Sequence, residues 1–372
     1  MIIGIDARAL SIKKPAGIAT YLRGILNQLQ DIDKENEYIL YSNVEIDASV
    51  IRADNFRIKT VKGTVGSFWL RFKMPKVIKK DGVTVFWGAE HVLPRRKKGI
   101  TYVLTVYDLA LFVNPSWGQW TNVLIQKMLL KPSVKQADRI IAISGSTKND
   151  IVKYCGKDPQ RIEAIYSGAS YTEQEILPAD IEATKEKYKI HKKYFLYLGT
   201  IEPRKNIKTV VRALEIINKE HEYQFVVAGQ LGWKYQSILS RIEASPCRED
   251  IVLTGYVSRL EKEVLFHCAE AFLFPSHYEG FGIPIIEAMH RRTPVITARN
   301  SSLAEVGGDA AFYADDENDA EAIAKLMRQC AEMSSEERQQ RIKKGQDNAL
   351  RFSWEKCARE VHACLTGSIE KP

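Results

Sequence analysis

The sequence has few of the features that mark metal-binding, disulfide-stapled or membrane-spanning proteins. Its six cysteines, among 372 residues, form no C-x-x-C pair, so their spacing indicates neither a zinc site nor a disulfide framework. None of the seven histidines stands in a metal-ligand spacing such as H-x3-H. The longest apolar runs, such as residues 102–106 and 271–274, are far shorter than the roughly 20 residues of a membrane-spanning helix. We therefore expect reduced cysteines, no required metal or other cofactor, and no helix that crosses a bilayer.

The start of the sequence leads us to expect no signal peptide. Met1 is followed at once by a strand-like run at residues 2–6, without a charged segment, a long apolar stretch or a cleavage site. We therefore expect a cytoplasmic protein. The length and the composition, 45% hydrophobic and 27% charged, are those of a folded protein with about two domains.

Acidic residues are outnumbered, with 46 Asp and Glu against 54 Lys and Arg and a formal charge of +8. This charge favours anionic partners such as phosphates, nucleic acid or an acidic membrane surface, and its sign alone does not choose among them. The basic residues gather between residues 71 and 80 and at residues 95–98, and a solvated face is the ordinary explanation of such runs. Because they are not interleaved with a recognisable nucleic-acid-reading motif, we expect no nucleic-acid partner.

Short β-branched runs alternate with amphipathic segments along the chain, which is typical of βαβ units and a mostly parallel sheet. The first series of expected strands comprises residues 2–5, 38–41, 83–86, 102–106 and 139–143. The second series comprises residues 194–198, 223–228, 251–253, 271–274 and 294–297. The polar segment between the two series, residues 167–180, is a candidate hinge.

Two consecutive α/β series predict two doubly wound domains that face one another across a cleft. We place the first domain at residues 1–180 and the second at residues 181–352. The last segment, residues 353–372, carries apolar residues at helical spacing. It could dock on either domain, and we place it on the first.

In open parallel sheets, ligands bind at the carboxyl ends of the strands, where helix N-termini and loop amides meet. The expected strands are followed there by glycines, carboxylates and cations. These residues are Asp6, the loop with Gly17, Asp108, Gly199, Arg204, Lys205, Gly229, Gly255 and residues 279–282. The sequence therefore predicts a binding site along this edge.

The most informative stretch is residues 274–289, where a strand ends, two glycines follow and a helix begins near Pro284. An anion can rest on the free N–H groups of that helix. Glu279 in the loop and Glu287 in the helix can then face the same pocket and accept hydrogen bonds from hydroxyl groups. A sugar attached to a phosphate supplies both kinds of group. Taken singly, each glutamate is better explained as a loop charge or as a partner of the helix dipole.

Two cations, Arg204 and Lys205, stand between an expected strand and a helix that starts near Asn206. Arginine can bind a phosphate with two hydrogen bonds and lysine acts as a point charge, so both suit an anion in the cleft. The alternative is a solvated pair at the start of a helix that Asn206 could cap. Cations at a helix N-terminus oppose its dipole, which weakens this alternative.

Asp108 follows the strand expected at residues 102–106. It is a candidate catalytic or acceptor-orienting carboxylate, and equally a turn residue before Leu109. The residues alone leave both interpretations open.

These residues resemble the family 4 glycosyltransferases, retaining enzymes in which two facing Rossmann-like domains form the GT-B fold around a deep cleft. The hallmark of that family, two glutamates with seven residues between them, matches Glu279 and Glu287 in their Glu-Gly-Phe-Gly-Ile-Pro context. Residues 199–206 and 253–257 and the loop with Gly17 also look like the family's donor site. The resemblance covers nearly the whole chain and is strongest between residues 194 and 314.

The resemblance implies a donor-binding role for each matching residue. These are Gly17, Arg204, Lys205, Tyr256, Val257, Glu279, Gly280, Phe281, Gly282, Ile283 and Glu287. Arg204 and Lys205 would bind the donor diphosphate and stabilise the leaving group in place of a metal. Glu279, with the amides of residues 280–283, would hold the donor sugar and phosphate, and Gly17 would lie near the diphosphate.

The same resemblance also assigns residues to the nucleoside, and it adds a fourth catalytic candidate to Arg204, Lys205 and Glu279. Glu287 would bind the ribose, and Tyr256 with Val257 would border the base. Asp108 carries over as the fourth catalytic candidate. Related bacterial mannosyltransferases often place a histidine directly before this aspartate, but this chain has Tyr107, so the histidine's contact with the sugar does not carry over.

The activity implied is a metal-independent, retaining transfer through an oxocarbenium-like state, in which fixed cations and helix amides stabilise the departing diphosphate. Similarity to bacterial mannosyltransferases favours mannose transfer from GDP-mannose to a lipid-linked O-antigen or polysaccharide acceptor, and a UDP-linked sugar is the open alternative. The stretch at residues 68–73 would then contact the anionic inner face of the plasma membrane. A core helix explains its aromatic residues nearly as well.

Other classes fit the sequence less well. An NAD-dependent dehydrogenase would need G-x-G-x-x-G after a strand, which the first turn at residues 6–9 lacks. A nucleotide-sugar epimerase shares the two-domain fold but would not be expected to carry the paired glutamates. A catalytically silent nucleotide-sugar-binding protein is harder to exclude, because only a transfer or hydrolysis assay separates it from an enzyme.

Overall fold

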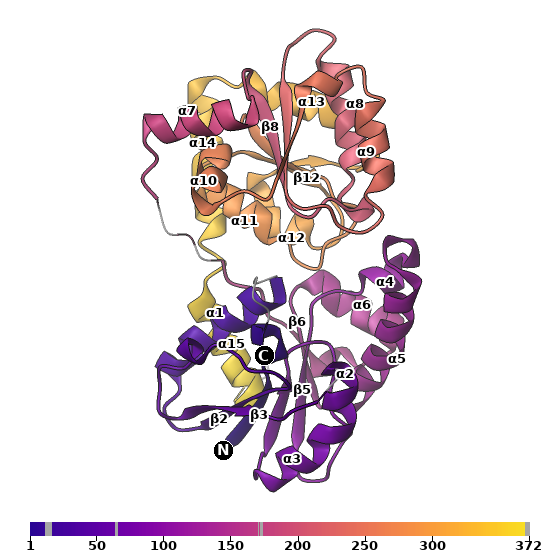
Figure 1. Cartoon of the computed structure of the whole chain (residues 1–372), viewed down its shortest axis with the longest axis vertical. Coiled ribbons are helices and arrows are strands. Elements are labelled where there is room, and N and C mark those ends of the chain that lie inside the picture. Colours follow the sequence, from indigo (N-terminus) through magenta and orange to yellow (C-terminus); the bar gives the residue numbers. More distant parts are fainter. Residues whose placement is uncertain (12–16, 64–65, 170, 172–173, 369–372) are drawn as a thin grey trace. The chain divides into compact units, whose positions relative to one another are not determined.

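A computed structural model of the chain describes residues 1–11, 17–63, 66–169, 171 and 174–368. The chain divides into two compact units (Figure 1). The first comprises residues 1–168 with residues 352–372, and the second comprises residues 169–351. The first unit therefore ends before the boundary at residue 180 that the sequence favoured.

The first unit is built around a seven-stranded sheet with the strand order β3-β2-β1-β4-β5-β6-β7. Every neighbouring pair is parallel. The strands are β1 (Ile2–Asp6), β2 (Glu37–Ser42), β3 (Phe56–Thr60), β4 (Val85–Gly88), β5 (Thr101–Val106), β6 (Arg139–Ala142) and β7 (Ile162–Ala164). The order reverses between β1 and β4, and such a switch point is where ligands bind in open parallel sheets.

Right-handed crossovers place the helices of this unit on both faces of its sheet. The helices are α1 (Gly17–Ile32), α2 (Gly66–Phe68), a π-helical turn (Trp69–Lys73), α3 (Met74–Lys80), α4 (Ala110–Val113), α5 (Trp120–Gln136), α6 (Gly145–Cys155) and α15 (Trp354–Thr366). α3 leads from β3 to β4 and α5 from β5 to β6, in the same direction across the sheet, so both lie on one face. α1 leads from β1 to β2 in the opposite direction and lies on the other face.

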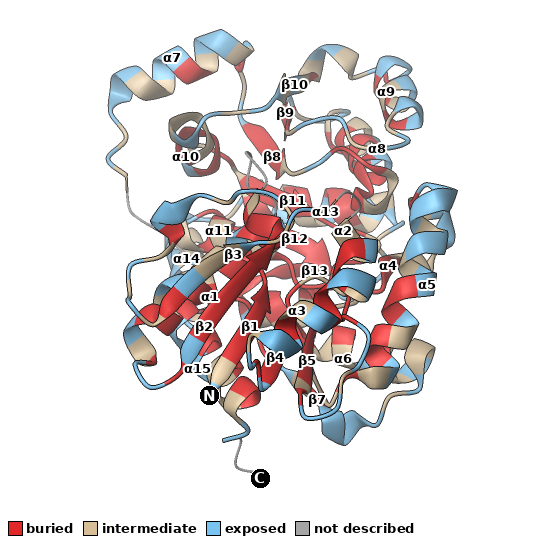
Figure 2. Ribbon diagram, turned by 60° about the horizontal axis from the view of Figure 1, so that its bottom comes forward, coloured by how far each residue is buried: buried red, intermediate tan, exposed pale blue. Residues whose placement is uncertain are grey.

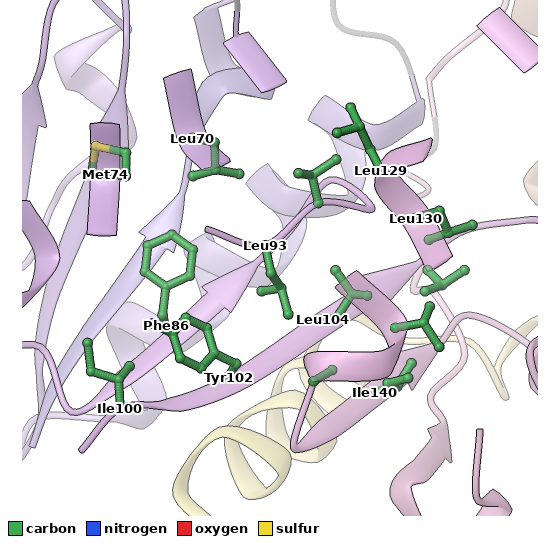
Figure 3. Packing of buried hydrophobic residues seen from close by; sticks show 14 of the residues in the cluster. Leu70, Met74, Phe86, Leu93, Ile100, Tyr102, Leu104, Leu129, Leu130 and Ile140 are labelled. Carbon is green, nitrogen blue, oxygen red and sulfur yellow. The ribbon is translucent and has the colours of Figure 1, made fainter. Parts of the chain in front are cut away.

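A cluster of buried side chains fastens α3 and α5 to the sheet (Figure 3). Met74 comes from α3, Leu129 and Leu130 come from α5, and Phe86 and Tyr102 come from the central strands. Figure 2 shows these strands as buried along their length. Each such side chain stabilises the fold by about 1.5 to 3 kcal/mol. The outward faces of α3 and α5 are therefore held in a fixed position on this unit.

The C-terminal helix α15 packs against α1 of the first unit. The rings of Trp354 and Tyr21 meet edge to face with their centroids 6.2 Å apart. His362 Nε2 lies 2.9 Å from Asp33 Oδ2, next to the turn that follows α1. The chain thus returns to the first unit after it has built the second.

The second unit contains a six-stranded sheet with the order β10-β9-β8-β11-β12-β13, again parallel throughout. Its strands are β8 (Tyr194–Leu198), β9 (Gln224–Ala228), β10 (Ile251–Gly255), β11 (Ala271–Phe274), β12 (Val295–Ala298) and β13 (Phe312–Ala314). Its helices are α7 (Pro178–Tyr188), α8 (Ile207–Ile217), α9 (Gln236–Glu243), α10 (Arg259–His267), α11 (Ile283–His290), α12 (Leu303–Gly307), α13 (Ala320–Ala331) and α14 (Ser335–Ala349). The strand order reverses between β8 and β11, which makes this the second switch point.

Three strands, β3, β7 and β13, were not predicted, and all three are edge strands. Two of them have only three residues each, and β3 alternates apolar with charged or polar residues. They lack the continuous β-branched runs of strands that are buried on both faces, which was the signal used for the others. The expected strands otherwise match to within about two residues at each end.

None of the helices in the described part of the chain is both long and apolar enough to cross a bilayer. All six cysteines are free thiols.

Candidate active site

At the carboxyl edge of the second unit's sheet, three strands end in or are followed by a glycine. Gly199 and Gly229 follow β8 and β9, and Gly255 closes β10. The Gly229 N–H donates a hydrogen bond of 2.8 Å to the Gly255 carbonyl. A Cβ atom on Gly229 would lie 1.9 Å from the carbonyl oxygen of Gly199, and its φ is 146°, so only glycine fits there. A ligand can therefore approach the main chain closely along this edge.

Four charged side chains meet at the switch point between β8 and β11. Lys205 Nζ lies 2.6 Å from one oxygen of Glu279, and Arg204 Nη1 lies 2.8 Å from the other. Arg204 Nη2 also pairs with Glu202 at 2.8 Å. The side chains are between 2% and 14% exposed. We call Glu202, Arg204, Lys205 and Glu279 the second-unit cluster. It contains three of the four predicted catalytic residues, with Arg204 and Lys205 both paired to the carboxylate of Glu279.

The two cations keep Glu279 ionised although its side chain is buried. Burial alone would raise the pKa of this carboxyl, but the charges of Arg204 and Lys205 outweigh burial and hold the pKa at about 2. Burial raises the pKa of Glu202, against the opposing charge of Arg204. The cluster therefore contains two positive charges that are already desolvated and fixed in place, which is the arrangement that stabilises a developing anion most effectively.

Hydrogen bonds fasten the loop after β8 to the loop after β11. The His277 N–H donates to the Arg204 carbonyl (2.9 Å), and Arg204 Nη1 donates to the Tyr278 carbonyl (2.7 Å). Asn206 adopts a left-handed conformation with φ of 57°, and its side-chain amide donates to the Pro275 carbonyl (3.0 Å). Asn206 holds the N-cap position of α8 without a side-chain capping bond. Its amide therefore joins the two loops and does not cap the helix.

A polar segment after β12, residues 300–302, fixes the loop that carries Glu279. The Glu279 N–H donates to Ser301 Oγ (3.0 Å), and Ser302 Oγ donates to the carbonyls of Glu279 (2.9 Å) and Phe281 (2.6 Å). Sequence reasoning missed this support. The signal was a run of Asn and Ser directly after an expected strand, at the edge where ligands were predicted to bind.

Residues 280–283 lead from this loop into α11. Gly280, Phe281 and Gly282 are buried, and Gly282 has a φ of 115° that L side chains rarely adopt. Ile283 begins α11, and Pro284 occupies its first turn, where a missing N–H costs no hydrogen bond. The first N–H groups of a helix have no partner within it, so this segment supplies amide donors close to Glu279 in sequence and in space.

The predicted nucleoside-binding residues lie on other elements of the second unit. Glu287 is on α11 and forms an ion pair with Lys262 of α10. Tyr256 and Val257 follow β10, and Tyr256 is 72% exposed. In the described part of the chain, Glu279 and Glu287 share no ion-pair partner.

The remaining predicted residues belong to the first unit. Asp108 follows β5, and its carboxylate accepts a hydrogen bond from the Ala110 N–H (3.0 Å), as a turn residue does. Gly17 is exposed at the first position of α1, and the rest of its loop lies outside the described residues. Tyr107 is buried and donates to the Ala89 carbonyl (2.8 Å), and the imidazole of His91 lies edge to face with its ring at 5.3 Å.

A second charged group, of which sequence reasoning named only Asp6, lies at the switch point of the first unit. Asp6 is fully buried at the end of β1 and accepts two hydrogen bonds from the guanidinium of Arg8, of 2.8 and 2.7 Å. Arg8 also pairs with Glu90, after β4, at 3.1 Å. Burial raises the pKa of Glu90 to about 7; the charge of Asp6 adds to this and that of Arg8 opposes it. We call Asp6, Arg8 and Glu90 the first-unit cluster. The sequence analysis named Asp6 at this edge, but it did not name Glu90, because the strand before it was expected at residues 83–86 and not at 85–88.

Among the described residues, no group of three or more His, Cys, Asp and Glu side chains is placed to hold a metal ion.

Comparison with known proteins assigns the two units to one enzyme family. The Glycosyltransferase Family 4 pattern matches residues 17–172, and the Glycosyl transferases group 1 pattern matches residues 180–348. The chain is 30% identical over 280 residues to O-antigen chain mannosyltransferase B of Escherichia coli, which covers 74% of this chain and 72% of that protein. It is 27% identical over 275 residues to O-antigen chain mannosyltransferase RfbU of Salmonella typhimurium, covering 73% and 72%.

Solved structures with the same fold match nearly the whole chain. A glycosyltransferase from Rickettsia africae superposes with a TM-score of 0.72 at 15% identity and covers 100% of this chain and 99% of that one. WaaG, a glycosyltransferase involved in lipopolysaccharide biosynthesis, superposes with a TM-score of 0.71 at 16% identity and covers 99% and 100%. The sequence matches, and the two parallel-sheet α/β units, show that this chain belongs to the family 4 glycosyltransferases and has the GT-B fold.

Proposed function

We propose that this glycosyltransferase moves mannose from GDP-mannose, with retention of configuration, onto a lipid-linked oligosaccharide or polysaccharide of the O-antigen or another cell-surface glycan. The choice of mannose is supported by the two similar proteins that are O-antigen chain mannosyltransferases. The observation that carries the proposal is the pair of cations, the largely buried Arg204 and the buried Lys205, held on Glu279 at the switch point of the second unit.

Arg204 and Lys205 act on the leaving group. As the bond from the anomeric carbon to the diphosphate breaks, negative charge grows on the phosphate oxygens. Cations that are already desolvated stabilise this charge without reorganising, and so do the amides of residues 280–283. Glu279 keeps both cations in position before the donor arrives, and its oxygens accept hydrogen bonds from the hydroxyl groups of the donor sugar.

The same cations take the role that a metal ion has in other glycosyl transfers, so we propose that no metal is needed. The transferred sugar passes through an oxocarbenium-like state, and the acceptor hydroxyl enters from the face that the diphosphate leaves. A phosphate oxygen of the donor takes the proton of that hydroxyl. Asp108, from the first unit, orients the acceptor.

We assign the remaining donor contacts to Glu287, Tyr256, Val257 and Gly17. Glu287, at present paired with Lys262, accepts hydrogen bonds from the ribose hydroxyls. Tyr256 and Val257, beyond β10, border the base, and the exposed Tyr256 ring offers it a stacking face. Gly17, at the exposed start of α1 in the first unit, is assigned to the diphosphate by the family resemblance alone.

A lipid-linked acceptor brings the enzyme to a membrane surface. Phe68 and Phe72 are each 48% exposed, in a stretch with two basic residues, Arg71 and Lys73. We propose that this stretch contacts anionic lipid at the inner face of the plasma membrane, where each cation contributes about 1 kcal/mol.

A thermal-shift series with GDP, UDP and their sugars tests the donor. The bound nucleotide stabilises the protein by RT ln(1 + [L]/Kd), about 2.7 kcal/mol at a hundredfold excess over Kd. We expect GDP and GDP-mannose to raise Tm and UDP to have little effect. A response to UDP alone would replace GDP-mannose by a UDP-sugar, and no response to either would remove the donor site.

A transfer assay separates an enzyme from a silent nucleotide-sugar-binding protein. We expect the wild type to transfer mannose in the presence of a chelator, and the Glu279→Ala, Arg204→Ala double variant to be inactive. Activity that survives both substitutions would contradict the assignment. Binding of GDP-mannose without hydrolysis or transfer to any lipid-linked acceptor would favour the silent binder.

A further inference from the structure

The charges of the second-unit cluster balance one another before any ligand is bound. Arg204 and Lys205 carry two positive charges, and the two glutamates carry two negative charges when both are ionised. The side chains of the cluster are at most 14% exposed, so solvent screens these charges only weakly. A diphosphate that binds both cations adds negative charge to a buried group of zero net charge. Binding is therefore favoured if one carboxylate moves away or loses its charge.

The guanidinium of Arg204 is divided between the two carboxylates. Its Nε and Nη2 atoms donate to the same oxygen of Glu202, Oε1, at 3.1 and 2.8 Å. Its Nη1 atom donates to Glu279 Oε2 (2.8 Å) and to the Tyr278 carbonyl (2.7 Å). A phosphate can bind this guanidinium with two parallel hydrogen bonds only if a carboxylate gives up a bond to it.

The two carboxylates differ in how firmly they keep their charge. Burial would raise the pKa of Glu279, but each of its oxygens has its own cation, and these cations hold the pKa at about 2. In the described part of the chain, no hydrogen-bond donor reaches Glu202 Oε2, although this oxygen is buried. Burial raises the pKa of Glu202, against the charges of Arg204 and Lys205. Because a buried carboxylate oxygen without a donor is costly, Glu202 is the group that loses its charge more readily.

Glu263, on α10, shows the pairing of a fully satisfied carboxylate in the same unit. Its side chain is 3% exposed, against 2% for Glu202. Arg291 Nε and Nη2 donate to different oxygens of Glu263, each at 2.7 Å. This is the two-pronged geometry in which one arginine satisfies both oxygens of a carboxylate. Burial of a glutamate beside an arginine therefore does not by itself leave an oxygen unpaired, and Glu202 differs because it shares its arginine with a second carboxylate.

The titratable groups that act most strongly on Glu202 are the other members of the cluster and one phenol of β8: Arg204, Lys205, Glu279 and Tyr197. Among the described residues, Arg204 is the one cation within ion-pair distance of Glu202. In the loop after β11, His277 pairs instead with Glu317 (3.2 Å). The segment packed alongside, residues 229–232, contains no titratable side chain. The charge of Glu202 is therefore set by the cluster and by what binds to it.

We propose that Glu202 takes up a proton when the diphosphate of the donor binds to Arg204 and Lys205, and that it thereby releases Arg204 to hold the diphosphate. The inference rests on the proposed donor site and adds a positioning residue to it. The proton comes from solvent and forms an O–H bond on the carboxylate, and no other covalent bond forms or breaks. The arriving phosphates disfavour the ionised form of Glu202, as any nearby like charge does.

This coupling gives the affinity for the donor a defined dependence on pH. Where binding takes up one proton, Kd rises about tenfold for each unit of pH. At a pH below the pKa of Glu202 in the free protein, the group is already protonated and Kd is constant. At a pH above it, the carboxylate has to be protonated on binding, so the donor binds more weakly as pH rises.

Isothermal titration with GDP-mannose, in two buffers that differ in ionisation enthalpy, counts the protons taken up on binding. The diphosphate of this ligand is substituted at both ends, so it has no terminal phosphate group that titrates near neutral pH. At the pH of maximum uptake, between about pH 5 and about pH 8, we expect the wild type to take up close to one proton for each donor bound. Glu202→Gln should take up none, and its Kd should not change over this range. Glu263→Gln is the matched control and should take up as many protons as the wild type.

A carboxylate that only held Arg204 in place would give a different result. Glu202→Gln would then bind GDP-mannose more weakly at every pH, with the pH dependence of the wild type unchanged, and the proposal would be wrong. Burial lowers the pKa of Lys205, so proton uptake that persists in Glu202→Gln would assign the proton to Lys205 and would also overturn the proposal. Equal loss of uptake in Glu263→Gln would show general damage to the unit and contradict a specific role of Glu202.

The wild type alone provides a second test, which does not depend on the folding of any variant. A Kd for GDP-mannose that is constant between about pH 5 and about pH 8, with no proton uptake, would contradict the role of Glu202 and leave the donor site intact. Failure of the wild type to bind GDP-mannose at any pH would instead remove the donor assignment, and this inference with it.

Discussion

In both units the strand order reverses between the first and the fourth strand, and a charged cluster lies at each reversal. In the first unit, the single cation Arg8 faces two carboxylates, Asp6 and Glu90. In the second unit, the two cations Arg204 and Lys205 face Glu202 and Glu279. The same topology therefore carries a cluster with surplus negative charge in one unit and a balanced cluster in the other.

The difference shows how each unit handles buried charge. In the first-unit cluster, burial and the charge of Asp6 raise the pKa of Glu90 to about 7, so Glu90 takes up a proton far more readily than an ordinary carboxylate and the surplus charge is lost below that pH. In the second-unit cluster, two cations hold the pKa of Glu279 at about 2, so the carboxylate keeps its charge and keeps both cations in place. The Arg8–Glu90 pair joins the segment after β1 to the segment after β4, whereas the two cations of the second-unit cluster are those that we propose bind the donor diphosphate.

Removal of Arg204 should have the largest effect on activity. We expect Arg204→Met to lower kcat by about 10²- to 10³-fold, because one fixed donor to the departing diphosphate is lost. The measurement is steady-state transfer of radiolabelled mannose. Arg212→Met, on the exposed side of α8, is the matched control and should retain wild-type activity. Equal activity of the two variants would place the leaving group elsewhere.

Removal of Arg8 should chiefly affect stability. Arg8→Met leaves the fully buried Asp6 without its partner, which should lower the free energy of unfolding of the first unit by about 3 to 5 kcal/mol. Tryptophan fluorescence in urea reports this unit, because five of the six tryptophans belong to it. Arg52→Met breaks an exposed pair with Asp31 and should cost at most about 1 kcal/mol. A comparable loss in both variants would mean that the first-unit cluster is not a buried charge network.

The two clusters should also respond to pH with opposite signs. The folded pKa of Glu90 lies above its usual value of 4.5, so its contribution to stability falls as pH rises from about 4.5 to about 7, by about 3 kcal/mol. The folded pKa of Glu279 lies below 4.5, so its contribution is present above that pH and is lost as pH falls toward about 2. Unfolding in urea across this range should give a flatter curve for Glu90→Gln than for the wild type. An unchanged curve would contradict the raised pKa.

The smallest effect is expected at Tyr256, which is 72% exposed. Tyr256→Ala should weaken GDP binding roughly fivefold to tenfold, because a stacked base is worth about 1 kcal/mol or more. Isothermal titration measures the change, and Leu350→Ala, at a site that is 73% exposed on the same unit, is the control. Unchanged GDP binding would remove Tyr256 from the base site.

The central strands could be predicted because they are buried on both faces and read as continuous β-branched runs. β3, β7 and β13 could not, since an edge strand is half exposed and its residues alternate or are few. The exposed apolar side chains of α5 were also hidden in the sequence. Leu124 and Met128 look the same as Leu129 and Leu130, and only the packing decides which pair enters the core.

The meeting of Arg204, Lys205 and Glu279 followed from a general rule, because loops after neighbouring strands of a parallel sheet converge. The exact pairing did not follow, because it depends on hydrogen bonds that hold the two loops. The Asn206 amide donates to the Pro275 carbonyl, the Glu279 N–H donates to the Ser301 hydroxyl, and the Ser302 hydroxyl donates to the Glu279 carbonyl. Glu90 lies two residues past the end of β4. It was missed because the strand was expected at residues 83–86, so Glu90 did not count among the residues that follow a strand.

The central claim is that Arg204 and Lys205 bind the diphosphate of the donor, and a comparison of GDP with GMP by isothermal titration tests it most directly. The account predicts that the wild type binds GDP at least tenfold more tightly than GMP and that Arg204→Met brings this ratio close to one, with Arg212→Met unchanged. A variant that keeps the wild-type preference for GDP over GMP would contradict the account.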